Sequence, residues 1–543
     1  MTMSTLHTRN TSPYTWSKQD LFFGVLQMLA LTCAIVQWRI GTSPENVACV
    51  TMVVASSTLV FQYLWRSGST VEYPVSSLAL LGSCFTTQFA ALLAQTLDGT
   101  EFVALLRWPE TTFAVLSGVQ VLLVGTHWVY RHMAISQSIS GYITEHVLEP
   151  IGAMAAPPVY AIWAMSVLGI VAMLNGGGAA TGDVGGKFFQ AFNFMAYIPC
   201  LIPIYYRQFG EAYCDFKIHG TLLAVYVGVM IVTAIVMNAR QFMAVGPVQV
   251  GFIFLLFYWR DPQPITAQTL RRLAVITVLL GVAISFFADL SLAMVINRDK
   301  RSSVSRIELM KETWETLLDR ERIEQFKQAE LSTSSYKRYD ETYLSNPMMA
   351  RFSETKFHDN NIYFSTLTTD AERAETWQVT IDKAMSILPQ PVIDGLDLKV
   401  DKNYTTYSFG DFYRYLSEGL DNTLGGFAVG SLWAHLITLF GLTWFPVVVV
   451  VLTYPAFVFI DSFSRKGTSR LDVAPVVMCS SWLLFSYAIG GESLVWKVGF
   501  YLRDLPQKVI LYLMAYAAVK YGCLLFGKDI HSMGRTKVQG HVG

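Results

Sequence analysis

The sequence predicts an all-α polytopic integral membrane protein with about 12–14 transmembrane helices and one large loop in its second half. Apolar residues make up 52% of the 543-residue chain and charged residues only 15%, whereas charged residues are about 25% of an ordinary soluble domain. The charge is also concentrated, because residues 297–422 hold 17 Lys and Arg and 22 Asp and Glu, or 39 of the 80 charged residues. The rest of the chain is therefore far more apolar than the average composition suggests.

The apolar segments have the length of membrane spans, since a helix needs about 20 mostly apolar residues to cross a bilayer. They divide the chain into an N-terminal transmembrane block of about nine helices (1–296), a large, partly helical extramembrane loop (297–422), and a C-terminal block of three to four helices with a short tail (423–543). The expected spans are 21–38, 46–65, 74–97, 111–130, 157–174, 188–205, 220–237, 241–259, 272–296, 424–442, 446–462, 474–489 and 508–526.

The distribution of Lys and Arg favours a topology with the N-terminus in the cytoplasm and the loop 297–422 outside. Residues 462–470 and the basic C-terminal tail also look cytoplasmic, which requires an odd number of crossings after the loop. The Gly-rich segment 424–442 is the candidate for a re-entrant segment, because glycines permit a broken helix that lines a cavity. The opposite topology, with the loop inside, stays open.

The loop has internal order. Ser305 and Glu308 fit a capping box, and the stretch to about Leu331 has a helical pattern. Ile307 and Trp314 belong to an apolar stripe that predicts an amphipathic helix, which lies either on the bilayer surface or against the protein's own surface.

Composition excludes several function classes. A net charge of zero and the lack of a basic run speak against nucleic acid as a partner. The seven cysteines lie in or near apolar segments and form no CxxC or His/Cys cluster, so we expect neither a metal site nor a cofactor.

Ionisable residues at membrane depth are functional candidates, because burying them in a bilayer is costly. Arg240 lies at a short turn between two spans, and Asp289, His127 and His435 lie within or near spans. Arg240 could equally extend its side chain to the headgroups. A single membrane histidine is more often a structural hydrogen-bond partner than a base.

The loop contains a denser set of charged residues. Arg351, Lys356, His358 and Asp359 lie within nine residues, and Lys402, Asp411 and Arg414 follow. Arginine and lysine suit a diphosphate, and a nearby carboxylate or histidine could take a proton from an attacking sugar hydroxyl. An exposed loop of ordinary charge density would show similar spacing.

A further charged cluster lies between the last two spans. Glu492, Lys497 and Arg503 occur there within IGGESLVWKVGFYLRDLPQ. The cluster is either a second half of the same site or an anchor at the membrane surface.

The chain resembles the repeat-unit polymerases of bacterial surface polysaccharides, the O-antigen and exopolysaccharide (Wzy-type) polymerases. The resemblance rests on the architecture across nearly the whole chain, on the arginine of the NAR turn (238–240), and on NPMMARFSETKFHDN and SFGD followed by GGFAVGS.

The resemblance implies an inverting, metal-independent glycosyl transfer at the outer leaflet of the bacterial inner membrane, related to that of the O-antigen ligases. The partners implied are a polyprenyl-diphosphate-linked glycan, the lipid bilayer, and chain-length regulator or export proteins. It implies two groups of site residues: Arg240, Arg351, Lys356, Arg414 and Arg503 as diphosphate-binding residues, with Asp359, Asp411 and His435 as acceptor-side catalytic residues.

Other functions stay open. A lipid-linked oligosaccharide flippase or another transporter would explain the charged residues at membrane depth, but gives no reason for a 126-residue loop. An O-antigen ligase-like transferase, a glycosyltransferase using a polyprenyl-phosphate donor, and an assembly subunit of a secretion complex are further alternatives.

Overall fold

A computed structural model describes most of the chain, namely residues 17–176, 188–238, 241–261, 265–298, 300, 303–333, 344, 346–388, 390–400, 405–419, 424–426, 428–466 and 471–525. These residues form helices joined by turns, and their one isolated β-bridge pairs Ser464 with Val473. The predicted all-α fold class is confirmed.

The first block contains most of the long helices. Their bounds are α1 Lys18–Ile40, α2 Pro44–Ser67, α3 Ser69–Glu72, α4 Pro74–Cys84, η1 Phe85–Phe89, α5 Ala90–Asp98, α6 Pro109–His132, α7 Ala134–Tyr142, η2 Ile143–Leu148, α8 Val159–Gly176, η3 Asn193–Leu201, α10 Ile202–Phe209, η4 Gly210–Ala212, α11 Phe216–Val236, α12 Gln241–Arg260 and α13 Ala267–Ile296.

The helices of the predicted loop and of the last block are shorter on average. Their bounds are α14 Arg306–Leu318, α15 Arg320–Thr333, α16 Pro347–Phe352, α17 Thr355–Leu367, α18 Asp370–Met385, α19 Gln390–Gly395, α20 Phe409–Glu418, α21 Leu432–Asp461, α22 Pro475–Met478, α23 Ser481–Tyr487, α24 Leu494–Gly499, η7 Phe500–Asp504 and α25 Leu505–Leu525.

Nine helices among the described residues are long and apolar enough to cross a membrane, and two shorter apolar helices cover 159–175 and 245–260. The chain is therefore a multi-pass helical membrane protein. The predicted segments 424–442 and 446–462 both end in α21, whose two helical parts meet at a break at Gly441, one residue before the end of the first predicted segment. Residues 424–431 are not helical where described.

Two of the predicted spans are interrupted for identifiable reasons. α21 breaks at Gly441, whose φ of 69° and ψ of 164° lie outside the helical region, a conformation that glycine adopts readily. The predicted span 474–489 is divided into the short helices α22 and α23. The first helix of the predicted loop is divided too, because Asp319, between α14 and α15, has a non-helical ψ of 85°.

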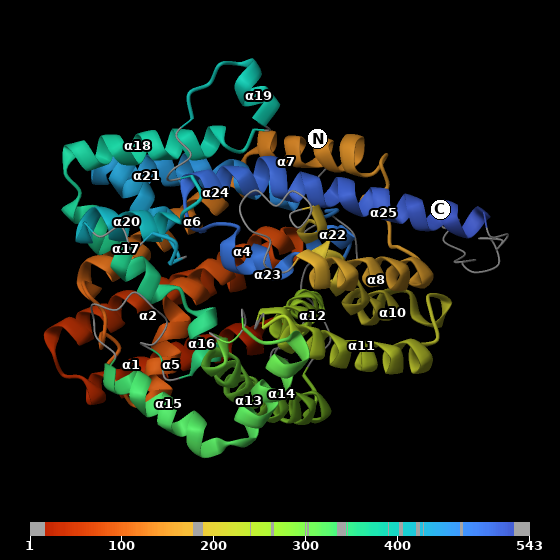
Figure 1. Cartoon of the computed structure of the whole chain (residues 1–543), viewed down its shortest axis with the longest axis horizontal. Coiled ribbons are helices and arrows are strands. Elements are labelled where there is room, and N and C mark those ends of the chain that lie inside the picture. The colour runs from red at the N-terminus through yellow and green to blue at the C-terminus, as the bar shows by residue number, and fades with distance from the viewer. Residues whose placement is uncertain are drawn as a thin grey trace.

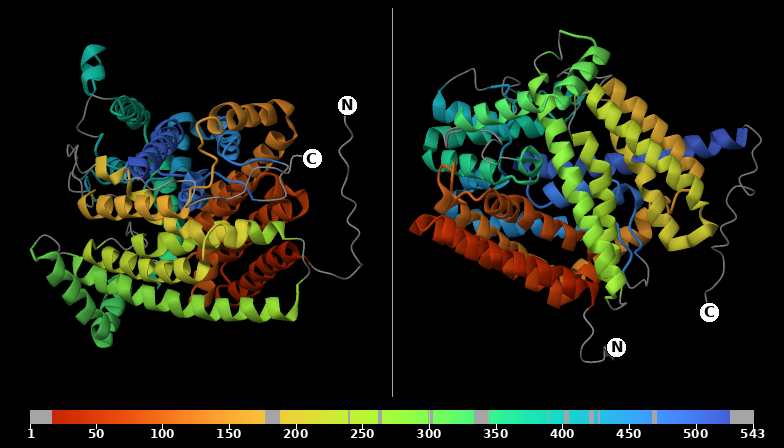
Figure 2. Two further views of the ribbon diagram at one scale, coloured as in Figure 1. Left: turned by 90° about the vertical axis from the view of Figure 1, so that its right-hand side faces the viewer. Right: turned by 90° about the horizontal axis from the view of Figure 1, so that it is seen from below.

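The core of the molecule is formed around α4, in which every residue is buried. α2 packs on α1 and α6, and α6 in turn packs on α21. Figure 1 shows α17, α18 and α20 together at one end of the helix block, whereas α25 runs to the opposite end. Figure 2 shows α13 along one outer side of the block. Only 12% of the most apolar stretch of this helix is buried, which agrees with that position.

The amphipathic helix of the predicted loop is α14. Its residues Leu309, Thr313 and Thr316 are buried against the end of the helix block, whereas Ile307 and Trp314 are 75% and 51% exposed. One side of the helix therefore covers the protein itself, and the other presents apolar side chains outward.

Close backbone contact depends on glycine where α4 meets α23. A Cβ added at Gly82 would lie 1.9 Å from the carbonyl oxygen of Phe485. Because a backbone atom cannot rotate away, we expect Gly82→Ala to destabilise the protein by about 3 kcal/mol, at the upper end of the range for overpacking. Thermal unfolding of the detergent-solubilised protein measures the effect.

The matched control for this prediction is Gly118→Ala in α6, where nothing lies within 4 Å of an added Cβ. We expect that variant to unfold at or slightly above the temperature of the parent protein, because alanine favours a helix over glycine. Equal unfolding temperatures for the two variants would contradict the close contact.

Candidate functional site

The most polar buried helix of the predicted loop is α17. It packs against α21, α20, α6 and η1, and its charged and amide side chains are withdrawn from solvent. Those exposed by 2% or less are Lys356, His358, Asp359, Asn360 and Asn361. Burial of such groups is costly unless each finds a partner, so their contacts define what this helix does.

Asp359 caps α6 from a distant part of the chain. Its carboxylate accepts the backbone N–H groups of Arg107 at 2.6 Å and Trp108 at 2.8 Å, and the hydroxyl of Thr112 at 3.2 Å. Burial raises the pKa of the Asp359 carboxyl, an effect opposed by Lys356 and by these hydrogen bonds. The N–H groups at a helix start lack intrahelical partners and carry partial positive charge, so Asp359 stabilises the start of α6.

Lys356 also has partners near the start of α6. Its ammonium lies 3.7 Å from Asp359 Oδ2 and donates to the carbonyl of Leu105 at 2.5 Å. The structure thus brings the predicted diphosphate ligand Lys356 and the predicted catalytic Asp359 together as a buried ion pair with a packing role.

Asp411 on α20 and His435 on α21 form hydrogen bonds with different partners. Asp411 accepts the N–H groups of Ala428 at 2.8 Å and Gly425 at 3.2 Å, which fixes the approach to α21. His435 Nδ1 accepts the N–H of Leu494 at 3.1 Å, and its Nε2 lies 2.9 Å from Thr380 Oγ1. Both ring nitrogens of His435 are therefore occupied.

The predicted arginines are distributed over separate elements. Arg414 on α20 pairs with Glu418 at 3.0 Å near the surface, and Arg503 is exposed in η7. Arg351 lies in α16, three residues before Glu354, and its side chain lies outside the described residues, as does the whole of Arg240.

Glu354, the N-cap residue of α17, and His358 in its first turns form a pair with a ring nitrogen that is free within the described part of the chain. His358 Nε2 lies 3.7 Å from Glu354 Oε2, and its Nδ1 lies 2.7 Å from Ser431 Oγ. Nε2 is buried and has no hydrogen-bond partner among the described residues. With the ring proton assigned to Nδ1 and donated to Ser431, Nε2 keeps a lone pair that can accept a proton.

This pair carries a sequence signal that the prediction did not use. Glu354 and His358 are four residues apart at the start of a helix, which places them on one face. Glu354 is held there by its own backbone N–H, which donates to the carbonyl of Thr86 at 2.7 Å. Thr86 belongs to η1, a π-helical turn, and such turns occur frequently at functional sites.

The predicted cluster of Glu492, Lys497 and Arg503 is separated by the structure. Glu492 accepts the N–H of Phe409 at 2.9 Å, at the start of α20. Lys497 donates to the carbonyls of Ala488 and Ile489.

A lysine that the prediction did not single out lies beside Glu492. Lys383 donates to the carbonyl of Tyr407 and lies 4.6 Å from the centre of the Phe409 ring. Burial lowers the pKa of Lys383 and raises that of Glu492, and their opposite charges oppose both shifts.

A second polar network lies at the other end of α6. Asp461 accepts the N–H of Ser76 at 3.0 Å, the Ser76 hydroxyl, and the Tyr130 hydroxyl at 3.0 Å. The Ser76 hydroxyl also lies 2.8 Å from His127 Nε2, and His127 Nδ1 lies 2.7 Å from the Tyr63 hydroxyl. Since Ser76 is in the first turn of α4, Asp461 caps α4 from the end of α21.

Asp289, expected to lie at membrane depth, is partly exposed near the end of α13. It pairs with Lys327 of α15 at 3.1 Å. The contact ties the end of the N-terminal block to the predicted loop.

The fold and these networks define a polytopic helical membrane protein with a polar interior. Comparisons with protein-family models, with curated proteins and with solved structures found no match to this chain. Within the described ranges, no three His, Cys, Asp or Glu residues are grouped as metal ligands would be.

Proposed function

We propose that this protein is a bacterial inner-membrane glycosyltransferase that polymerises polyprenyl-diphosphate-linked oligosaccharide repeat units into a surface polysaccharide. The observation that supports this best is the Glu354–His358 pair on α17, a polar helix inserted between α6 and α21 and adjacent in sequence to the arginine-bearing helix α16. Transfer from a diphosphate carrier requires a base for the acceptor hydroxyl and a cation for the departing diphosphate.

In this proposal His358 Nε2 takes the proton of the acceptor sugar hydroxyl as its oxygen attacks the anomeric carbon of the donor. The bond between that carbon and the diphosphate oxygen breaks, and its electron pair leaves with the polyprenyl diphosphate. A single displacement inverts the anomeric configuration. Glu354 stabilises the imidazolium that forms, and Arg351 stabilises the charge on the departing diphosphate.

The proposal predicts that His358→Gln reduces chain extension by a factor on the order of 10²–10⁴, the usual contribution of a general base. Arg351→Ala should act in the same direction. Both variants should insert normally and accumulate single repeat units on the lipid carrier, which electrophoresis of the extracted glycans measures. His132→Gln and Arg373→Ala, at an exposed histidine and a partly exposed arginine, are matched controls.

One result would contradict the role of His358 as the base. If His358→Gln, inserted at the parental level, produced polymer of parental length and amount, the assignment of His358 as base would be wrong. Loss of polymer in the two control variants would show that the assay responds to general damage.

A second candidate function is a proton-coupled flippase for lipid-linked oligosaccharides. The observation that favours it is the chain of hydrogen-bonded groups from Tyr63 through His127 and Ser76 to Asp461, because Asp and His relays are common in transporters. Under this alternative, His127→Gln should abolish the appearance of repeat units on the outer leaflet, whereas under the polymerase proposal single units should still reach it.

A further inference from the structure

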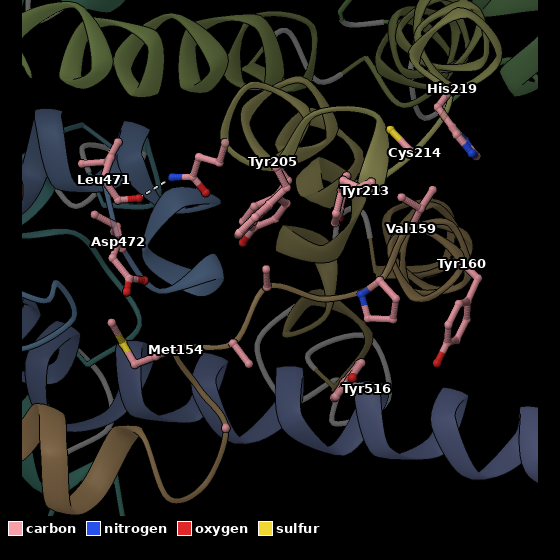
Figure 3. Close-up of a pocket in the computed structure, with 18 of the residues that line it drawn as sticks. Met154, Val159, Tyr160, Tyr205, Tyr213, Cys214, His219, Leu471, Asp472 and Tyr516 are labelled. Atoms are coloured by element: carbon pink, nitrogen blue, oxygen red, sulfur yellow. Dashed lines mark hydrogen bonds between the residues drawn. The ribbon is translucent and has the colours of Figure 1, made fainter. Parts of the chain in front are cut away.

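A cavity of about 1170 Å³ lies at the end of the helix block opposite to α17. It is bounded by the start of α8, by α10, by α25 and by the segment around Asp472 (Figure 3). α8 and α25 also carry exposed apolar residues, such as Val167 and Val171 on α8 and Met514 on α25. The cavity therefore lies between two helices that present apolar side chains on their outer surfaces.

Aromatic side chains from three helices line this cavity. Tyr160 and Trp163 come from α8, Tyr205 from α10 and Tyr516 from α25. Figure 3 shows the three tyrosines around the cavity. Aromatic faces attract ammonium groups through the negative charge of their π systems. Tyrosine and tryptophan at the end of membrane helices are also typical of the headgroup level of a bilayer.

The charges in the cavity are arranged at two places. Arg465 bridges Glu149 and Asp472, with 2.5 Å from Nε to Glu149 Oε1 and 2.5 Å from Nη1 to Asp472 Oδ2. Arg260 also interacts electrostatically with Asp472, so two carboxylates and two guanidinium groups meet there. Lys520, which is exposed on α25, supplies a positive charge at the rim.

One buried polar group in the cavity lacks a protein partner. Tyr205 is 3% exposed, and its hydroxyl has no hydrogen-bond partner among the described residues. Figure 3 shows this hydroxyl pointing into the cavity, on the side of Asp472. A buried hydroxyl without a partner is costly, so a ligand atom that bonds to it would be favoured.

We propose that this cavity binds the headgroup of a phospholipid that carries a primary ammonium, such as phosphatidylethanolamine. The ammonium lies among the aromatic rings near the Glu149–Arg465–Asp472 bridge and within reach of the Tyr205 hydroxyl. The phosphate lies at Lys520, and the acyl chains follow the outer surfaces of α8 and α25. The proposal is independent of the polymerase function.

Native mass spectrometry of the purified full-length protein tests the proposal. The protein is titrated with phosphatidylethanolamine or with phosphatidylglycerol of the same acyl chains. We expect tighter retention of phosphatidylethanolamine, and we expect Lys520→Gln to weaken it on the order of tenfold, as for loss of a charged hydrogen bond. Tyr205→Phe should weaken it by a smaller factor.

Matched controls separate the cavity from general lipid binding. Lys217→Gln, at an exposed lysine of α11, and Tyr206→Phe, beside the cavity residue Tyr205, should bind as the parent protein does. Equal retention of the two lipids, or parental binding by Lys520→Gln and Tyr205→Phe together, would overturn the proposal. Displacement of the lipid by soluble phosphoethanolamine at equal concentration would overturn the assignment to a lipid.

Discussion

Asp359→Ala is expected to destabilise the protein by about 3–5 kcal/mol, the effect of removing one partner of a buried ion pair. The substitution removes the carboxylate that pairs with the buried ammonium of Lys356. It also removes the carboxylate that accepts the backbone N–H groups of Arg107 and Trp108 at the start of α6. The yield of monodisperse protein and its unfolding temperature in detergent measure the loss.

Two further variants test the reason for this effect. Asp359→Asn keeps one acceptor oxygen for the start of α6, so we expect a smaller loss than with alanine. The double variant Asp359→Leu with Lys356→Met removes both charges, and replacing a buried ion pair by apolar residues is often neutral. It should therefore recover part of the stability lost in Asp359→Ala. No recovery would show that the caps on Arg107 and Trp108, rather than the ion pair, dominate.

Asp461→Ala is expected to have the second largest effect. Its carboxylate is the acceptor for three donors, the N–H and hydroxyl of Ser76 and the hydroxyl of Tyr130. Each donor left buried and unsatisfied costs about 1–3 kcal/mol, so we expect a loss of at least about 3 kcal/mol in unfolding free energy. The same detergent unfolding measurement applies.

Tyr130→Phe is the control for this prediction, because it removes one donor and leaves the carboxylate with the other two. It should lower stability by roughly 1 kcal/mol, the value of a single hydrogen bond. If Asp461→Ala were no less stable than Tyr130→Phe, the hydrogen bonds from Ser76 to Asp461 would contribute little to stability.

The sequence was sufficient to predict the helical membrane fold, because long apolar runs have few alternatives in a bilayer. The bounds of α1, α2, α6 and α13 lie within a few residues of the predicted spans. The division of the later segments was harder to predict. The apolar stretches before and after Gly441 both have the composition of membrane spans. The break itself depends on the backbone conformation of Gly441, which composition does not predict.

The candidate site was predictable only in part. The charged run from Arg351 to Asp359 was recognised, and it does overlap the start of the buried helix α17. The roles within that run were not predictable, because they depend on partners about 250 positions away: Asp359 bonds to residues 107 and 108, and Lys356 to residue 105. The spacing of residues in a sequence predicts which side chains share one face of a helix. It does not predict which other element packs on that face.

At three helix starts, a carboxylate from a distant part of the chain accepts backbone N–H groups. Asp359 serves α6, Asp461 serves α4 and Glu492 serves α20. Each carboxylate lies later in the chain than the helix that it serves. The burial of these three carboxylates therefore has a common physical explanation in the charge and the free N–H groups of a helix start.

This order along the chain has a consequence for biosynthesis. When the ribosome has completed the spans of residues 1–296, the residues that satisfy the starts of α4 and α6 have not yet been made. The carboxylates that accept the N–H groups at the starts of α6 and α4 therefore join the N-terminal block only when residues 359 and 461 have been made. A truncated chain ending at residue 296 is expected to insert but not to pack, and to be degraded rather than to accumulate as an autonomous domain.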